Sequence, residues 1–233
     1  MSINVLAFNC SPNEENGNTA KILNHLLDGM KGQGASVELY YTQRLTIDKC
    51  QGCTENPEFS STGECIIVDD MKYLYPKMRN ADIWIFASPN YNNTINTSLL
   101  TLFDRLEPLF EPFTTHTNGN SSNNNNSAKR KMLLISTGNQ FDYKSFQKLT
   151  DHVESLSHLF NREFLGAIVR QHAWILNDHE ILPTAIEKYF TDIYNAGVEI
   201  IQKGKLPKTT LKKLNKDLIT KKSFLGSIVS ELN

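Results

Sequence analysis

The feature that most constrains the fold of this chain is an alternation of short apolar segments with helical patterns. Ile3–Phe8, Asp82–Ala87 and Met132–Ile135 are almost entirely apolar and do not alternate with polar residues. Unbroken runs of this length are typical of strands covered on both faces, as in a parallel sheet. Val37–Tyr40 alternates as an edge strand does, and Phe164–Val169 is a fifth candidate strand.

Apolar residues at helical spacing fill the stretches between these strands. The expected helical faces run from Ile22 to Met30, Met71 to Met78, Ile95 to Leu106, Phe146 to Phe160 and Ile186 to Ile200. Strands that alternate with helices predict an α/β fold, here a doubly wound five-stranded parallel sheet with helices on both faces. In such a sheet, ligands bind beyond the C-terminal ends of the strands.

Composition narrows the class of protein. With 24 Lys and Arg against 25 Asp and Glu, the net charge is −1, which argues against a basic nucleic-acid binder. No apolar run approaches the roughly 20 residues of a membrane span, and the first residues lack the basic region of a signal peptide. Four Cys in 233 residues do not make a disulfide scaffold. We therefore expect a cytoplasmic protein with no nucleic-acid or membrane partner.

The charges are unevenly distributed along the chain. Eight Lys and one Asp lie between Lys203 and Lys222, a local charge of +7, so the rest of the chain carries −8. This pattern predicts a main domain over residues 1–203 and a basic C-terminal extension over residues 204–233. We expect the extension to pack on the acidic body or on a second subunit, and the alternative is a patch for an anionic partner. Residues 117–127 are rich in Asn and predict a flexible loop at the end of the sheet opposite the ligand.

Three expected loops leave the C-terminal ends of strands and carry polar side chains. Residues 9–19, NCSPNEENGNT, lead into a helix, and their hydroxyls, amides and helix N-terminus can hold a phosphate without Lys. Residues 87–94, ASPNYNNT, offer a Tyr ring and amide groups to a heterocycle. Residues 136–141, STGNQF, contain a Gly that lets the backbone approach a ligand closely. The simpler interpretations are helix caps in the first two loops, at residues 18–19 and 93–94, and an ordinary turn in the third.

Together these loops resemble those of a known family. Ser11-Pro12 with Gly17-Asn18-Thr19, Pro89-Asn90-Tyr91, and Asp104-Arg105 at the end of the following helix are similar to motifs of the NADPH-dependent FMN reductases. This flavodoxin-like group includes quinone reductases and iron–sulfur flavoproteins. The similarity runs from about Val5 to about Gly138.

The resemblance implies the strand order 2-1-3-4-5, with FMN at the switch point between the first and third strands. The residues that it implies for FMN are, near the phosphate, Ser11, Asn18 and Thr19, with Asn13 in the same loop; beside the isoalloxazine ring, Pro89, Asn90, Tyr91 and Asn92; and on the other side, Thr137, Gly138 and Asn139. One departure concerns Glu14 and Glu15, which follow the Ser-Pro where relatives often carry a basic residue. We expect these carboxylates to point into water.

The cysteines follow the family's order but not its number. Cys50, Cys53 and Cys65 lie where iron–sulfur relatives carry a compact set of four Cys, and Asn56 stands at the third position of that pattern. Because a [4Fe–4S] cluster normally needs four thiolates, we expect no cluster and no metal site. A Zn site of three Cys plus another ligand and a Cys50–Cys53 redox pair are alternatives, and ordinary reduced thiols are the simplest interpretation. Asp69 and Asp70 are expected to cap the helix that follows.

The function implied by the resemblance is that of an FMN-dependent oxidoreductase. Hydride would pass from NADH or NADPH to the flavin, and electrons then to a small-molecule acceptor such as a quinone, a free flavin or a nitro- or azo-aromatic. Since the flavin supplies the chemistry, no catalytic residue is predicted, although His172 and His179 follow the fifth strand. The family also implies a homodimer or homotetramer. Two alternatives stay open, a flavodoxin-like electron carrier without NAD(P)H turnover and a scaffold that has lost FMN.

Overall fold

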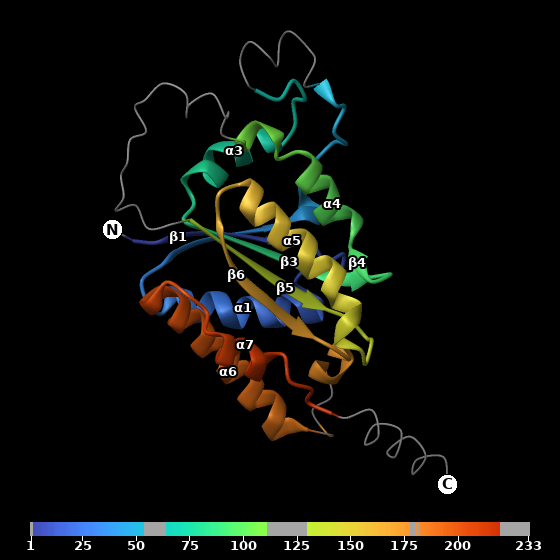
Figure 1. The fold of residues 1–233 in the computed structure, drawn as a ribbon, viewed down its shortest axis with the longest axis vertical. Helices are drawn as coiled ribbons and strands as arrows, with labels where there is room; N and C mark the ends of the chain where they lie inside the picture. Colours follow the sequence, from blue (N-terminus) through green and yellow to red (C-terminus); the bar gives the residue numbers. More distant parts are fainter. Residues whose placement is uncertain (1, 54–63, 111–129, 178–179, 181, 220–233) are drawn as a thin grey trace.

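A parallel sheet forms the centre of the molecule in a computed structural model that describes residues 2–53, 64–110, 130–177, 180 and 182–219. Its strands, in the order β2-β1-β3-β5-β6, are β1 (Asn4–Asn9), β2 (Ser36–Tyr41), β3 (Ile83–Tyr91), β5 (Lys131–Thr137) and β6 (Glu163–Arg170) (Figure 1). They are the five expected strands, and counted among themselves they have the predicted order 2-1-3-4-5. The predicted fold class is confirmed. The Asn-rich segment 117–127, Asn56 and His179 lie outside the described residues.

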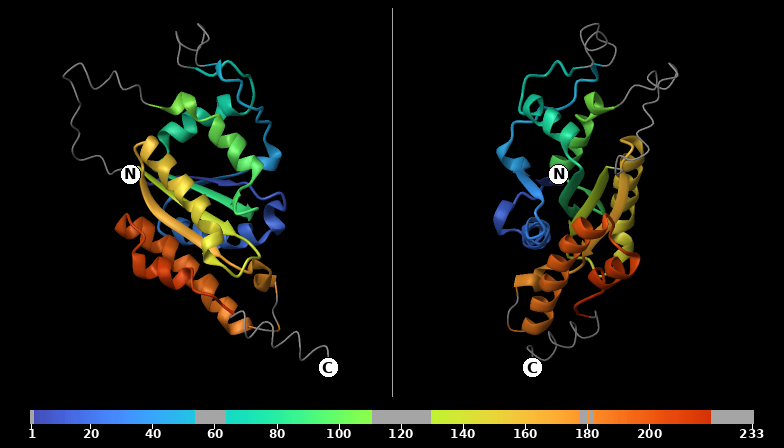
Figure 2. Two further views of the ribbon diagram at one scale, coloured as in Figure 1. Left: turned by 45° about the vertical axis from the view of Figure 1, so that its right-hand side comes forward. Right: turned by 90° about the vertical axis from the view of Figure 1, so that its left-hand side faces the viewer.

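Helices cover both faces of this sheet (Figure 2). α1 (Asn18–Lys31), α6 (Pro183–Lys203) and α7 (Lys208–Leu214) lie on one face, and α3 (Met71–Asn80), α4 (Thr97–Asp104) and α5 (Gln147–Leu159) lie on the other. Successive side chains of a strand point to opposite faces. Val5 and Ala7 therefore join the core under α1, and Leu6 and Phe8 join the core under α3 and α4. No helix in the described part of the chain is both long and apolar enough to cross a membrane.

Two glycines let α1 and α6 cross backbone to backbone. A Cβ at Gly29 would lie 2.0 Å from the carbonyl oxygen of Tyr194, and one at Gly197 would lie 2.1 Å from that of Leu26. Neither position accepts a side chain without moving a helix. The close crossing holds α1 in place, and the first turn of α1 continues the first of the three polar loops.

The segment between β3 and α4 differs from the expected helix. Asn92 and Asn93 have φ values of 52° and 60°, a left-handed conformation that Asn tolerates better than most residues. They form the two-residue turn of a hairpin between β3 and the short antiparallel β4 (Thr94–Ile95). Ile95 is buried as a strand residue, and Asn96 caps α4 by accepting a hydrogen bond from the N–H of Leu99.

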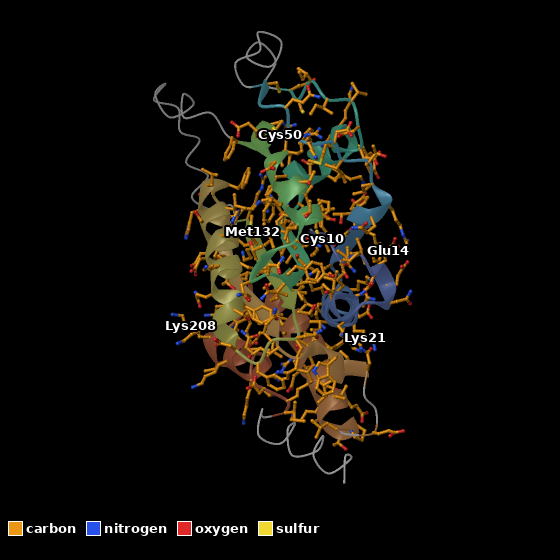
Figure 3. The ribbon with its side chains drawn as sticks, turned by 90° about the vertical axis from the view of Figure 1, so that its right-hand side faces the viewer. Cys10, Glu14, Lys21, Cys50, Met132 and Lys208 are labelled. Atoms are coloured by element: carbon orange, nitrogen blue, oxygen red, sulfur yellow. The ribbon has the colours of Figure 1, made fainter. Side chains whose placement is uncertain are left out.

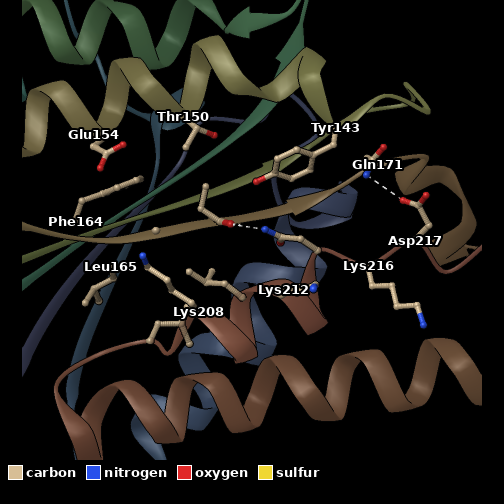
Figure 4. Close-up of a pocket in the computed structure, with 15 residues that line it drawn as sticks. Tyr143, Thr150, Glu154, Phe164, Leu165, Gln171, Lys208, Lys212, Lys216 and Asp217 are labelled. Carbon is tan, nitrogen blue, oxygen red and sulfur yellow. Dashed lines mark hydrogen bonds between the residues drawn. The ribbon is translucent and has the colours of Figure 1, made fainter.

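The described part of the basic extension packs on the body of the molecule. Leu206, Leu214 and Ile219 are buried as the chain follows the outer edge of β6. A cavity of about 870 Å³ lies between α5, β6 and α7 (Figure 4), with Phe164 among its apolar lining and Lys208 on its wall. None of the predicted cofactor residues lines this cavity.

Candidate cofactor site

The eleven residues predicted from the three loops line one cavity. It has a volume of about 510 Å³ and lies at the C-terminal ends of β1, β3 and β5, where the strand order reverses. The predicted residues on its wall are Ser11, Asn13, Asn18, Thr19, Pro89, Asn90, Tyr91, Asn92, Thr137, Gly138 and Asn139. Gln140 and Ala173, which were not predicted, complete the lining. The volume falls in the range of roughly 300–1,000 Å³ that is usual for small-molecule and cofactor sites.

Asn9, the last residue of β1, shapes the first loop. Its buried side chain accepts a hydrogen bond from the N–H of Ser11 at 2.9 Å and donates one to the carbonyl of Glu14 at 3.2 Å. Asn favours turns through such bonds to nearby backbone groups. Sequence reasoning missed this residue, although an Asn directly after an apolar strand is a recognisable turn signal.

The first turn of α1 meets the cavity without a side-chain cap. Gly17 is the N-cap residue, so Asn18 and Thr19 are helical residues and not caps. A Cβ at Gly17 would lie 3.0 Å from Ser11 Oγ, which shows how closely the loop returns to the helix. The first N–H groups of a helix lack intrahelical partners and carry the positive end of the helix dipole. With the hydroxyls of Ser11 and Thr19, they make a donor set suited to an anion.

Thr19 and Thr137 connect α1 to the end of β5. Their Oγ1 atoms lie 2.7 Å apart, and both side chains are buried. One hydroxyl donates to the other, so the second hydroxyl hydrogen and the remaining lone pairs can serve a ligand.

Asn96 holds the second loop to the first. Its Nδ2 donates to the carbonyl of Cys10, and its Oδ1 accepts from Ser88 Oγ and from the N–H of Leu99, each at 3.1 Å. The loops after β1 and β3 and the start of α4 therefore share one buried amide. Tyr91, on the rim, is 47% exposed, which leaves its ring open to a ligand.

Gly138 marks a narrow point in the third loop. A Cβ there would lie 2.3 Å from Gln140 Oε1 and 2.8 Å from Phe146 Cζ. The N–H of Gly138 donates to the carbonyl of Arg170 at 3.0 Å, and its carbonyl accepts from the N–H of Ala173 at 2.9 Å. The end of β6 therefore positions the third loop.

The lining of the cavity carries no charged side chain among the described residues. Glu14 and Glu15 lie outside it and share Arg44, whose Nε donates to Glu14 Oε2 at 2.6 Å and whose Nη2 contacts Glu15. A backbone N–H and the Arg44 guanidinium hold the pKa of Glu15 below its usual value. Because both carboxylates pair with a cation outside the cavity, they do not oppose an anion at the start of α1.

Two buried acceptors on the cavity wall, Asn90 Oδ1 and Gln140 Oε1, have no hydrogen-bond partner in the described part of the chain. The amide nitrogen of Asn90 donates to the carbonyl of Ser145 at 3.0 Å, which fixes the orientation of that side chain. A buried acceptor left without a partner costs about 1–3 kcal/mol. The two oxygens therefore suit a ligand that brings N–H donors.

His172 lies behind the cavity and not on its wall. The side chain is fully buried, and its ring stacks on Phe141 with 4.2 Å between the ring centroids. Burial lowers the pKa of His172, so the ring is neutral at pH 7. The N–H of His172 donates to the carbonyl of Gln140 at 3.3 Å, so this residue positions the third loop.

Two of the sequence motifs, Asp69-Asp70 and Asp104-Arg105, meet in a buried ion pair outside the cavity. Arg105 is 1% exposed and donates to both carboxylate oxygens of Asp69, at 2.5 and 3.0 Å, and to the carbonyl of Asp48 at 2.7 Å. Burial alone would raise the pKa of Asp69, but Arg105 and the N–H groups of Asp48 and Met71 hold that pKa below its usual value. Asp69 accepts from the first turn of α3 as expected, whereas Asp70 accepts from the N–H of Thr46 and makes no cap.

The four cysteines fall into two groups, represented by Cys10 and Cys50 in Figure 3. Cys10 is fully buried after β1, and this burial raises the pKa of its thiol to about 12. Cys50, Cys53 and Cys65 line a second cavity of about 310 Å³ next to Arg105. The sequence left a Zn site of these three Cys open as an alternative, but the described residues contain no group of three or more Cys, His, Asp or Glu side chains placed to hold a metal ion.

Comparisons with known proteins agree with this architecture. The family model described as NADPH-dependent FMN reductase matches residues 3–180. An iron–sulfur flavoprotein of Methanocaldococcus jannaschii is 31% identical over 105 residues, which are 45% of this chain and 52% of that protein. An iron–sulfur flavoprotein of Archaeoglobus fulgidus is 29% identical over 101 residues, 43% of this chain and 47% of that protein. The chain spans about half the length of the curated relatives it matches.

Solved structures show the same fold. An FMN-dependent NADH-azoreductase from Bacillus anthracis in complex with FMN has a TM-score of 0.59 at 12% identity, covering 85% of this chain and 99% of that one. An NAD(P)H:quinone oxidoreductase from Methanothermobacter marburgensis has a TM-score of 0.59 at 13% identity, covering 86% and 96%. At these identities the likeness concerns the fold alone.

The family match covers the three polar loops and all five strands of the parallel sheet. It confirms the family predicted from the loop motifs, and the description of that family names FMN and NADPH, the cofactors that the resemblance implied. On the match to residues 3–180, this chain belongs to the NADPH-dependent FMN reductase family.

Proposed function

We propose that this chain is a flavin-dependent oxidoreductase that holds FMN in the cavity between the three loops. The observation that carries the proposal is the convergence of eleven residues, named from three separate loops, on one uncharged cavity at the strand switch point. Doubly wound sheets bind their ligands at this place. The family membership supports the same cofactor.

The residues present fit FMN at both ends of the cavity. Ser11, Asn18 and Thr19, with the first N–H groups of α1, would hold the phosphate by hydrogen bonds without a cation. Asn90 Oδ1 and Gln140 Oε1 are acceptors that an N–H of the flavin ring would satisfy. Tyr91 and Pro89 would border the ring on one side, and the third loop, with Thr137, Gly138 and Asn139, would border it on the other.

When bound, FMN supplies the hydride and electron chemistry, which the side chains of this cavity do not supply themselves. The chain's residues would bind and orient the cofactor. Because the cavity wall carries no charged side chain, the positive end of the α1 dipole would balance the negative charge of the phosphate. Tyr91 is the titratable residue on the described wall, and it is solvent-exposed. We therefore infer that protons needed in the reaction come from solvent or from the substrates.

We propose NADH or NADPH as the hydride donor and a small molecule as the electron acceptor. Two structural neighbours, an azoreductase and a quinone oxidoreductase, suggest azo compounds and quinones as the first acceptors to test. The half-exposed ring of Tyr91 leaves the mouth of the cavity open, which suits planar molecules that reach the flavin one after the other.

Two curated relatives are iron–sulfur flavoproteins, which raises the question of an iron–sulfur cluster in this chain. A [4Fe–4S] cluster normally needs four thiolates. Cys50, Cys53 and Cys65 line one cavity but are not part of any group of three or more metal-binding side chains in the described part of the chain, and the fourth thiol, Cys10, is buried elsewhere with a raised pKa. The residues present do not fit such a cluster, and we propose that the chain carries none.

The test is a visible absorption spectrum of the purified full-length protein, followed by NAD(P)H oxidation with a quinone. In the double variant Ser11→Ala, Thr19→Ala, each lost charge-assisted hydrogen bond should cost about 1.5–3 kcal/mol, or roughly ten- to a hundredfold in FMN affinity. We expect this variant to be folded and nearly colourless. The control Ser2→Ala, Thr191→Ala removes two hydroxyls far from the cavity and should keep the wild-type flavin content.

Two outcomes would contradict the proposal. Wild-type protein that binds no FMN after reconstitution would be a scaffold without the cofactor. Protein that binds FMN but is reduced only by a partner protein, and never by NAD(P)H, would be an electron carrier.

A further inference from the structure

Three thiols from the segment between β2 and α3 line one cavity. Cys50, Cys53 and Cys65 line it together with Gly52, Asp104, Arg105, Glu107 and Pro108. It shares no lining residue with the cofactor cavity. The proposed oxidoreductase function therefore leaves these thiols unexplained.

Arg105 holds both ends of the segment that carries the three cysteines. Its guanidinium binds the carbonyl of Asp48, two residues before Cys50, and the carboxylate of Asp69, four residues after Cys65. Its Nη2 also lies 3.5 Å from Cys65 Sγ. Both ends of the Cys-bearing segment are thus held to one buried cation, which keeps the thiols near one another.

Cys50 has the features of an attacking thiol. It is exposed, whereas Cys53 and Cys65 are partly buried. The N–H of Gly52 donates to Cys50 Sγ at 3.5 Å, and Gly52 has a φ of 64°, so the chain turns back over this sulfur just before Cys53. Because Cys50 is the exposed thiol of the Cys50–Cys53 pair, an external disulfide reaches its sulfur first.

We propose that Cys50 and Cys53 form a dithiol/disulfide centre that reacts with small disulfides. The Cys50 thiolate attacks one sulfur of the external disulfide, forms a mixed disulfide and releases the other half as a thiolate. Cys53 then loses its proton and attacks Cys50 Sγ, which releases the second half. Two protein thiols are oxidised to one disulfide, the external disulfide is reduced to two thiols, and the two protons pass to those products.

The acidic side chains around the cavity should favour cationic over anionic disulfides as substrates. Asp104 and Glu107 line it and are exposed, while the charge of Arg105 is matched by Asp69. We expect a cationic disulfide such as cystamine to react faster than the anionic glutathione disulfide. Glu107→Gln should reduce this preference without removing the reaction.

The experiment treats reduced full-length protein with cystamine, without oxygen, and counts free thiols after denaturation. Of the four thiols in the chain, wild type should lose two and retain no cysteamine, with peptide mapping linking Cys50 to Cys53. Cys53→Ser should lose one thiol and retain one cysteamine on Cys50. Cys65→Ser, the matched control from the same cavity, should still form the Cys50–Cys53 disulfide. A Cys50–Cys65 link, a persistent cysteamine adduct in wild type, or a bound metal that blocks the reaction would each overturn the proposal.

Discussion

Arg105 and Asp69 form a buried ion pair, so the loss of either residue should destabilise the fold. The two side chains are each 1% exposed. Breaking a buried pair from one side leaves an uncompensated charge and typically costs about 3–5 kcal/mol. We expect Asp69→Asn to lower the free energy of unfolding by that order in urea titrations. Glu38→Gln, which breaks the exposed pair with Lys77, should cost about 0–1 kcal/mol.

The Arg105–Asp69 pair should also make the free energy of unfolding depend on pH in the acid range. The pKa of Asp69 is lower in the folded protein than in the unfolded chain, where Asp titrates near about 3.9. The pair's stabilisation is therefore fully present above that value and is lost as the pH falls through the folded-state pKa. Equal acid sensitivity in wild type and Asp69→Asn would contradict this assignment.

His172 should produce a second pH dependence, nearer neutrality. Its pKa is lowered by burial, so between the folded-state value and about 6.5 the unfolded chain binds more protons. Stability should fall as the pH drops through about 6.5 and level off below the folded-state pKa. His172→Asn, which tolerates the positive φ of 36°, should show a smaller slope between pH 7 and pH 5 in urea titrations. An unchanged slope would mean that His172 is not the group responsible.

At the scale of elements, the C-terminal extension forms hydrogen bonds with the edge strand β6, as a neighbouring strand would. Asn215 Oδ1 accepts from the N–H of Val169 at 2.8 Å, and its Nδ2 donates to the carbonyl of Ala167 at 2.9 Å, so one amide pairs with the free edge of β6. The buried guanidinium of Arg170 donates to the carbonyls of Leu214 and Lys216. The extension therefore satisfies polar groups that the sheet leaves open.

Truncation after Lys203 should for this reason destabilise the body of the protein. It exposes Arg170 and removes the buried side chains of Leu206 and Leu214, each worth about 1.5–3 kcal/mol. We expect a clearly lower melting temperature by calorimetry, or dissociation of an oligomer. Asn215→Ala should cost about 1–3 kcal/mol, and the exposed control Lys212→Ala should cost less than about 0.5 kcal/mol. Unchanged stability with lost binding to an anionic partner would favour the alternative interpretation of the basic segment.

Residue types and apolar spacing predicted only some of the points where helices begin. The apolar spacing of Ile95 suited a helix, but two left-handed Asn residues made a hairpin there, and Asn96 became the cap. Asp70 had the right residue type for a cap, but its carboxylate binds the N–H of Thr46 instead. In both cases a contact distant in sequence or an unusual backbone angle won over local preference.

At the scale of the whole molecule, the parallel sheet brings the three polar loops together at the C-terminal ends of its strands. Strands that run in the same direction end at the same side, so loops 78 and 47 residues apart, counted from Asn9 to Ala87 and from Asn90 to Thr137, meet in one cavity. The acidic body and basic extension also meet within one chain, for example through Lys213 and Asp192 at 2.6 Å. The homodimer or homotetramer implied by the family stays a prediction, which light scattering of the purified protein would measure.

The sequence by itself determined the fold class, the strand order through the family motifs, and which residues line the candidate cofactor cavity. It did so because apolar runs, helical periodicity and loop residue types are local properties that the parallel architecture converts into position. Only the tertiary structure decided where charges and thiols went: Glu14 and Glu15 to Arg44, Asp69 to Arg105, and three cysteines to one cavity. These outcomes depend on which side chains become neighbours after packing, and no spacing along the chain specifies the distance between a buried cation and its partner.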